Sequence, residues 1–210
     1  IWNSCDADAT EIKVSFEYNY FGNKLGQIEK IVIKDNGHGI KHEDMDDLFG
    51  LYGRSHKTYT DKTPNGRIYH GKQGQGRYKS FSLGNNVKWE SVYIADDNKK
   101  YKFSIEFDPE EKMKCYYTAK IMVSDDVQTG VTAKVSNIIQ SVSILSDSQK
   151  MLDDIMYSFA AYLLAYKDIN IYYDNMLIDP KEYIVDNTEK QIEFQENDIK
   201  KIAKVGIVLW

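Results

Sequence analysis

The strongest constraint on the fold is a run of strand-like segments with no helical pattern between them. Segments rich in β-branched and aromatic side chains cover residues 87–95, 101–107, 115–123 and 131–135. The first link, Asp-Asp-Asn at residues 96–98, is a turn signal. Consecutive strands joined by short links pair antiparallel, whereas the parallel strands of a Rossmann or P-loop sheet need helices between them. We therefore predict an α/β chain with a mixed, mostly antiparallel sheet.

The other periodic segments predict further strands and a layer of helices. Strand alternation recurs in residues 12–18, 28–34 and 169–173. Helical spacing of apolar residues marks residues 42–52 and 148–166, and a helix could also begin in residues 77–83. The long helix carries one apolar face made of Leu152, Ile155, Met156, Phe159 and Leu163. Helices covering one face of such a sheet would give a two-layer α+β sandwich.

Composition narrows the class of protein. The chain has 210 residues and a formal net charge of -5, which argues against a general nucleic-acid sleeve, because such sleeves are basic. Contact with nucleic acid is expected only through other domains. The chain has two cysteines, too few for a disulfide framework, and no apolar run long enough to cross a membrane. We expect a cytoplasmic protein without membrane contact.

The two ends of the sequence suggest a larger parent protein. The chain begins at Ile1 without a methionine and stops inside the apolar run at residues 205–210. We expect both ends to be cut from something longer. The predicted organisation is one domain over residues 1–178, truncated at its N-terminus. Residues 179–210 are predicted to start a following domain or to form a C-terminal extension.

The first stretch that could carry chemistry is Asn-Ser-Cys-Asp-Ala at residues 3–7. On a helix, Asn3 and Asp6 are three residues apart and share a face. Amide and carboxylate oxygens are hard ligands suited to Mg²⁺ that bridges phosphates. The alternative interpretation is a polar helix end without a ligand.

The second stretch is Asp-Asn-Gly-His-Gly at residues 35–39, directly behind an apolar strand. A carboxylate at the end of a strand can accept a hydrogen bond from an exocyclic amine. Gly37 and Gly39 would let the backbone approach a flat ring closely. The alternative is an ordinary hairpin turn, since Asn-Gly is a common turn signal. His38 is predicted to be a loop residue.

The third stretch lies at residues 71–80 and combines glycines with positive charge. Glycines free the backbone so that several N–H groups can converge on one anion. A helix that begins near Arg77 would aim its free N–H groups at the same place. Lys72 and Lys79 add charge. The alternative is a flexible basic loop; the spacing matches neither a P-loop nor a dinucleotide fingerprint.

Taken together and in this order, the three stretches resemble the GHKL, or Bergerat-fold, ATPases. Members include gyrase, the Bergerat-type heat-shock chaperones, histidine kinases and MutL. The resemblance covers roughly residues 1–175 and extends to the Gly-Val-Thr at residues 130–132, the long helix and the strand behind it. Among these relatives, the chain looks most like the chaperone-like and MutL-like bacterial ATPases. The resemblance implies a Bergerat fold.

The resemblance also implies roles for single residues. Asn3 would hold Mg²⁺ and the phosphates, Asp35 would accept from the adenine amine, and Lys79 is the predicted catalytic residue. The implied nucleotide-binding set is Asn3, Asp6, Ala7, Asp35, Gly37, Gly39, Ile40, Lys57, Gly71, Gly74, Gln75, Gly76, Arg77, Tyr78 and Thr132. The relatives carry a Gly-Thr pair, whereas Val131 follows Gly130 here, so Thr132 stands one place further on. One place along a strand changes the face.

The implied function is binding of ATP and Mg²⁺, and hydrolysis that drives closure of the glycine-rich lid, pairing of two copies and movement of attached domains. The general base of such ATPases is a glutamate four residues before the helix asparagine, a position upstream of Ile1. Two alternatives stay open. One is a histidine-kinase-type domain that transfers phosphate to a partner, and the other is a module that senses ATP without hydrolysing it.

Overall fold

One large sheet organises the chain in the computed structural model, which describes residues 1–21, 24–49, 61–70, 79–108, 110–111, 114–139, 148–196 and 199–209. Nine strands of these residues form the sheet, in the order β5-β4-β3-β7-β2-β1-β8-β9, with β6 paired to β4. Every neighbouring pair is antiparallel except β1 and β8. The predicted mixed, mostly antiparallel sheet is therefore confirmed.

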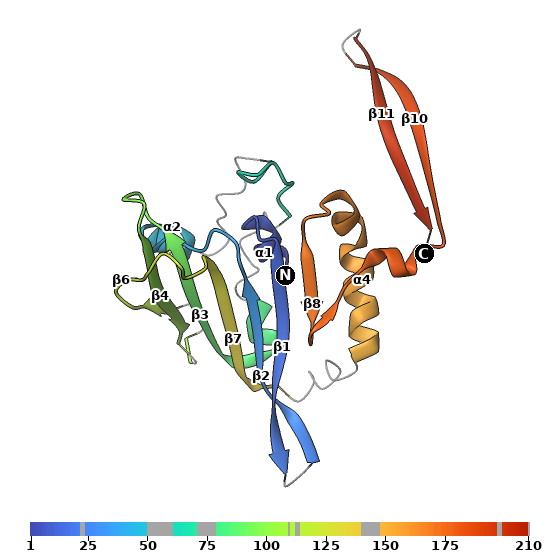
Figure 1. Cartoon of the computed structure of the whole chain (residues 1–210). Coiled ribbons are helices and arrows are strands. Elements are labelled where there is room, and N and C mark those ends of the chain that lie inside the picture. Colours follow the sequence, from blue (N-terminus) through green and yellow to red (C-terminus); the bar gives the residue numbers. More distant parts are fainter. Residues whose placement is uncertain are drawn as a thin grey trace.

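The strands of the sheet are β1 (Glu11–Phe21), β2 (Lys24–Asp35), β3 (Gly84–Ile94), β4 (Lys100–Phe107), β5 (Cys115–Tyr117), β6 (Ile121–Met122), β7 (Gly130–Ile138), β8 (Asn170–Tyr173) and β9 (Met176–Leu177). The order departs from the sequence order where β8 lies beside β1 and where β7 lies between β2 and β3 (Figure 1). This insertion brings the end of β2 beside the start of β7.

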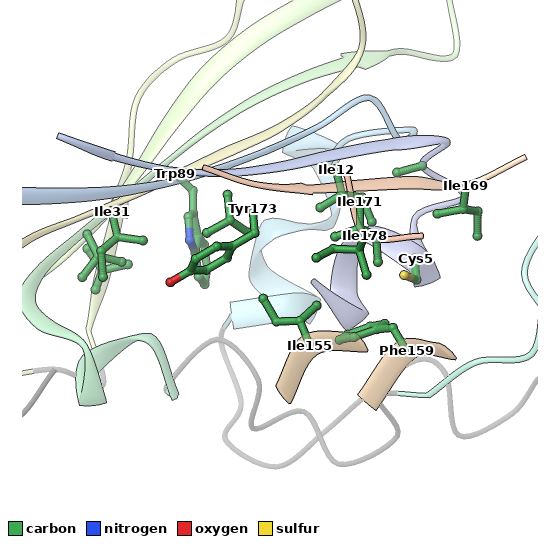
Figure 2. Close-up of a cluster of buried hydrophobic side chains, with 14 of the residues drawn as sticks. Cys5, Ile12, Ile31, Trp89, Ile155, Phe159, Ile169, Ile171, Tyr173 and Ile178 are labelled. Atoms are coloured by element: carbon green, nitrogen blue, oxygen red, sulfur yellow. The ribbon is translucent and has the colours of Figure 1, made fainter. Parts of the chain in front are cut away.

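Helices cover one face of the sheet. The α-helices are α1 (Trp2–Asp6), α2 (Met45–Phe49) and α4 (Ser148–Ala165), and the 3₁₀ turns are η1 (His42–Asp44), η3 (Ser80–Ser82) and η5 (Pro180–Tyr183). Figure 2 shows Ile155 and Phe159 of α4 pointing at Ile12 and Ile171 of the sheet. We call the covered face the inner face and the other the open face.

Strand alternation explains why the inner face is apolar. Trp89, Ser91 and Tyr93 of β3 are buried, and the alternate residues Glu90 and Val92 are more exposed. Phe103 and Ile105 of β4 are buried in the same alternating way. The open face carries charged pairs instead, among them Lys88–Glu106 and Glu90 with Lys102 and Lys134. Because successive side chains of a strand point to opposite faces, one sequence pattern builds both surfaces.

Two predicted elements differ in detail. The expected strand at residues 115–123 is split into β5 and β6, because one extra residue shifts the pairing with β4 between Ile105↔Tyr117 and Lys102↔Ile121. At this bulge the Thr118 Oγ1 accepts from the Ser104 N–H at 3.1 Å. The helix expected in residues 77–83 is, in its described part, the short turn η3.

The last two strands, β10 (Asp186–Glu196) and β11 (Ile199–Leu209), form a separate two-stranded sheet. Figure 1 shows this hairpin projecting away from the large sheet. Its apolar side chains Ile192, Phe194, Ile207 and Leu209 are exposed. In the part of the chain that the structure covers, no helix is both long and apolar enough to cross a membrane.

Candidate functional site

Asp35 ends β2, and its carboxylate is buried and held in place. The exposed fraction of the residue is 8%, and its Oδ1 accepts from the Gly37 N–H at 3.0 Å and the Val131 N–H at 3.1 Å. Both hydrogen bonds that the structure shows for this carboxylate end on Oδ1. Oδ2 is therefore the oxygen that can accept from a ligand.

The two glycines after Asp35 bring the backbone against neighbouring elements. A Cβ on Gly37 would lie 2.5 Å from the Ala7 carbonyl oxygen, and the His38 N–H donates to that same oxygen at 3.0 Å. Gly39 has a φ of +77°, and a Cβ there would lie 2.3 Å from the Val92 carbonyl oxygen. Only glycine fits either position, so the loop at residues 35–40 is fixed between α1 and β3.

Side chains that the sequence did not single out hold this loop. The Asn36 Oδ1 accepts from the N–H groups of Thr10 and Glu11, both at 2.8 Å, and its Nδ2 donates to the Thr10 Oγ1 at 2.9 Å. The Ser91 Oγ accepts from the Ile40 N–H at 2.7 Å and donates to the Ile40 carbonyl at 2.8 Å. The Asn-Gly turn signal pointed to Asn36, whereas nothing local pointed to Ser91.

Helix α1 supplies the other side of the site. Asn3 is exposed and Asp6 is only 2% exposed. The Asp6 Oδ1 accepts from the His70 N–H at 3.0 Å. The His70 ring stacks on Trp2 with 4.0 Å between ring centroids. Since residue 71 opens the glycine-rich sequence, the chain reaches that sequence directly beside α1.

The start of β7 touches the Asp35 backbone. Gly130 has a φ of +136°, and a Cβ there would lie 2.0 Å from the Asp35 carbonyl oxygen. Thr132 pairs with Lys34 and with Glu90, so it lies on the open face, on the opposite side of the sheet from Asp35. The residue of β7 that contacts the Asp35 carboxylate is therefore Val131, through its backbone N–H. The Thr132 side chain points to the other face of the sheet, so the structure does not place it beside Asp35.

Lys79 lies near the start of β3, whereas Asp35 and the loop at residues 35–40 lie near the end of β3. It is exposed and directly precedes η3, whereas Ser91, which holds the loop, stands seven residues beyond Gly84. Seven residues of strand span roughly 23 Å. The structure therefore does not place Lys79 beside Asp35. The other predicted residues lie outside the described residues: Lys57, Gly71, Gly74, Gln75, Gly76, Arg77 and Tyr78.

The described residues around Asp35 and α1 offer neither a reactive thiol nor a cluster of metal-binding side chains. Cys5 is fully buried, and burial raises the pKa of its thiol to about 11, which keeps it protonated and unreactive at neutral pH. Within the described residues, no three His, Cys, Asp or Glu side chains gather to hold a metal ion. A metal here would need ligand oxygens beside Asn3, and phosphates supply such oxygens.

The loop at residues 35–40 packs tightly on its neighbours, and Asp35 ends β2 beside it with an oxygen, Oδ2, that can accept from a donor group. Added Cβ atoms at Gly37 and Gly39 would collide with the backbone around the loop, so the backbone there is as close to α1 and β3 as the chain allows. Asp35 faces this loop from the end of β2. A buried carboxylate held in this way can accept a hydrogen bond from a donor group of a ligand.

Comparisons with known proteins identify the family. The family model described as histidine kinase-, DNA gyrase B- and HSP90-like ATPase matches residues 1–140, two thirds of the 210-residue chain. The sequence search found no curated protein that matches the chain.

Several solved structures are similar in fold. The MutL ATPase domain of Aquifex aeolicus, complexed with ADP, has 16% identity and a TM-score of 0.49, with 90% of this chain and 68% of that chain covered. The ATPase region of Saccharomyces cerevisiae topoisomerase II has 15% identity and a TM-score of 0.48, with 85% and 48% covered.

The N-terminal domain of a DNA repair protein has 17% identity and a TM-score of 0.50, and the alignment covers 97% of this chain and 63% of that one. At this identity the likeness concerns the fold. The family match, together with the Bergerat-type sheet, assigns the chain. It belongs to the histidine kinase-, DNA gyrase B- and HSP90-like ATPases, the GHKL superfamily.

Proposed function

We propose that the chain binds ATP with Mg²⁺ between the loop at residues 35–40 and helix α1. Membership of this ATPase family supports ATP binding. The observation that carries the placement is that the Gly37 backbone packs on Ala7, one residue from Asp6, while Asp35 holds a buried carboxylate at the end of β2. Two stretches nearly thirty residues apart thus form one surface.

In this proposal the base lies at Asp35 and the phosphates lie toward Asn3. The Asp35 Oδ2 accepts from the adenine amine, partly through water, while Gly37, Gly39 and Ile40 flank the ring. Asp6 and Ala7 line the middle of the site, and the Asn3 amide oxygen supplies one ligand to Mg²⁺. The glycine-rich sequence at residues 71–78, with Lys57, wraps the phosphates through backbone N–H groups.

Hydrolysis, closure of the glycine-rich segment and pairing of two copies are further parts of the proposal. The supporting observation is that the chain joins the glycine-rich sequence directly beside Asp6, through His70. The water-activating base would be the glutamate predicted upstream of Ile1. The segment at residues 179–210 would pass the change to attached domains. Binding without hydrolysis is the alternative that a turnover assay distinguishes.

The direct test is titration calorimetry of ATP-Mg²⁺ against the chain and its Asp35→Asn variant. The amide presents N–H donors to the adenine amine and removes the charge, so we expect the Kd to rise by about 100-fold or more. Asp154→Asn, at an exposed position on α4, is the matched control and should leave the Kd unchanged. Unchanged ATP affinity of Asp35→Asn would show that the adenine contact is misplaced.

Turnover is measured separately as phosphate release. Release of phosphate without transfer to a histidine would support the ATPase activity over the kinase-type alternative. Because the predicted base lies upstream of Ile1, the assay uses a protein that includes that position, and tight binding by that protein without any release would leave a nucleotide-sensing module.

A further inference from the structure

Residues 61–70 form a small turn that packs on the connection between α1 and β1 and on the connection between α4 and β8. We call it the 61–70 turn. Within it the Thr63 N–H donates to the Arg67 carbonyl at 2.8 Å, and the Gly66 N–H donates to the Thr63 carbonyl at 2.9 Å. Thr63 and Arg67 are each only 4% exposed. A turn with two such buried polar residues is held by its surroundings rather than by a core of its own.

One side of the 61–70 turn binds the connection between α1 and β1. The Asp8 carboxylate accepts from the Thr63 hydroxyl at 2.5 Å and from the Asn65 N–H at 3.1 Å. Asp8 has a φ of +57°, a left-handed conformation that aspartate tolerates better than most side chains. The turn is therefore attached to the residue that ends the α1 region.

Arg67 joins this connection to a third part of the chain. Its Nη1 donates to the Ala9 carbonyl at 2.6 Å, and its Nη2 donates to the Asp168 carboxylate at 2.6 Å. Asp168 lies between α4 and β8 and is itself largely exposed. Tyr166, in the same connection, accepts from the Ile68 N–H at 3.2 Å through its hydroxyl. One planar guanidinium thus ties together segments about 60 and 100 residues apart in sequence.

The turn ends where it meets the candidate site. Three residues after Arg67, the His70 N–H donates to the buried Asp6 carboxylate. The His70 ring stacks on Trp2 and makes a T-shaped contact with Tyr162. The His70 Nδ1 is 3.8 Å from the Asp6 Oδ1. Arg67 and the residue whose backbone N–H meets Asp6 thus belong to the same docked turn, three residues apart.

We propose that Arg67 is a positioning residue for nucleotide binding, because it holds His70 against Asp6 and so fixes the Asp6 carboxylate beside the site. The inference rests on the proposed function, since Asp6 is placed in the nucleotide site there. Arg67 does not touch the ligand and acts through the 61–70 turn. Loss of Arg67 lets the turn move away, and Asp6 loses its His70 partner.

The first measurement compares ATP-Mg²⁺ binding by the chain and by Arg67→Met. We expect the Kd to rise by about tenfold, since a buried donor fork and the Asp6 partner are lost together. Arg67→Lys should fall between the two, because one ammonium cannot reach both Ala9 and Asp168 as the fork does. Lys88→Met removes an exposed ion pair on the open face and should keep the wild-type Kd.

A double-mutant cycle with Asp6→Ala, which removes the acceptor of the His70 N–H, separates positioning from a general loss of structure. If Arg67 acts through Asp6, Arg67→Met should cost less than about twofold in Kd when Asp6 is already replaced. Fully additive losses would overturn the proposal. Asp168→Asn, at the exposed partner, offers a mild version of the same change should Arg67→Met fold poorly; it should raise the Kd by about twofold to threefold.

The position of His70 is read without nucleotide from its ring proton resonances, which the stacked Trp2 ring shifts. In Arg67→Met this shift should decrease, and in Lys88→Met it should stay. A wild-type chain that does not bind ATP-Mg²⁺ refutes the proposed function, whatever the His70 resonance shows. The other outcome is that the wild-type chain binds ATP-Mg²⁺ and Arg67→Met has the same Kd and the same His70 resonances as the wild type. That outcome refutes only the role of Arg67.

Discussion

The loop at residues 35–40 and the open face of the sheet are adjacent, yet opposite kinds of interaction hold them. The loop is fixed by close backbone contacts and by hydrogen bonds that involve Asn36, Ser91 and Val131. The open face is covered by exposed lysine and glutamate pairs, in which water competes with every contact. The comparison teaches that the many charged side chains of the open face do not mark the positions where substitutions destabilise the fold most. Those positions are expected in the loop, where the backbone is packed closely.

The largest effect is expected at Gly130, where β7 touches the Asp35 backbone. In Gly130→Ala a Cβ would lie 2.0 Å from the Asp35 carbonyl oxygen, and backbone atoms cannot rotate away as a side chain can. We expect a loss of roughly 4 kcal/mol or more in unfolding free energy, measured by urea denaturation.

Gly206 in β11 provides the matched glycine for this experiment. An added Cβ there meets no atom within 4 Å, so Gly206→Ala should change stability by less than about 0.5 kcal/mol. Equal effects of the two substitutions would contradict the idea that the loop is held by close backbone approach.

An intermediate effect is expected at Asn36. Asn36→Ala removes three hydrogen bonds to Thr10 and Glu11 and leaves two backbone N–H groups without their acceptor. The expected loss is about 1–2 kcal/mol in unfolding free energy, measured in the same denaturation assay. Asn86→Ala, at an exposed position in β3, is the control and should be close to neutral. A neutral Asn36→Ala would mean that the glycines alone fix the loop.

The smallest effect is expected at Glu90 on the open face, and it depends on pH. Hydrogen bonds from Lys102 and Lys134 lower the pKa of Glu90 from 4.5 to about 2. Since the folded-state pKa lies below the unfolded one, the charged form stabilises the fold above about pH 4.5, and this contribution is lost as the pH falls toward 2.

Glu90→Gln should therefore cost about 1 kcal/mol at pH 7, and the difference from the wild type should shrink as the pH is lowered through that window. Denaturation curves at pH 7, 4 and 3 measure this. Glu106→Gln, which breaks only one exposed pair, should cost less. A Glu90→Gln penalty as large as that of Gly130→Ala would remove the contrast between the two regions.

The elements of the fold could be predicted from the sequence far better than their arrangement. Alternation along β3 and β4 and the apolar face of α4 are local patterns, and the structure confirms them because each pattern is satisfied by burying one face. The insertion of β7 between β2 and β3 has no local signal. It depends on pairing between residues about 100 positions apart.

The candidate site shows the same division. Asp35, Gly37 and Gly39 could be singled out because a carboxylate and two glycines behind an apolar strand are visible in the sequence. Ser91 and Arg67 could not, since their partners Ile40 and Ala9 lie 51 and 58 residues away and a lone serine or arginine has no distinguishing pattern. Whether Val131 or Thr132 contacts Asp35 depends on the register in which β7 pairs with β2, and the sequence carries no signal for that register.

The central place of β7 has a consequence for how the chain is synthesised. In the strand order, β2 and β3 are joined only through β7, although about 95 residues separate the end of β2 from the start of β7. A nascent chain that has emerged from the ribosome only as far as β6 holds two partial sheets that cannot yet pair. Contacts of such long range close slowly. The Val131 N–H reaches Asp35 only after that closure, so ligand-binding competence should be among the last properties acquired during translation.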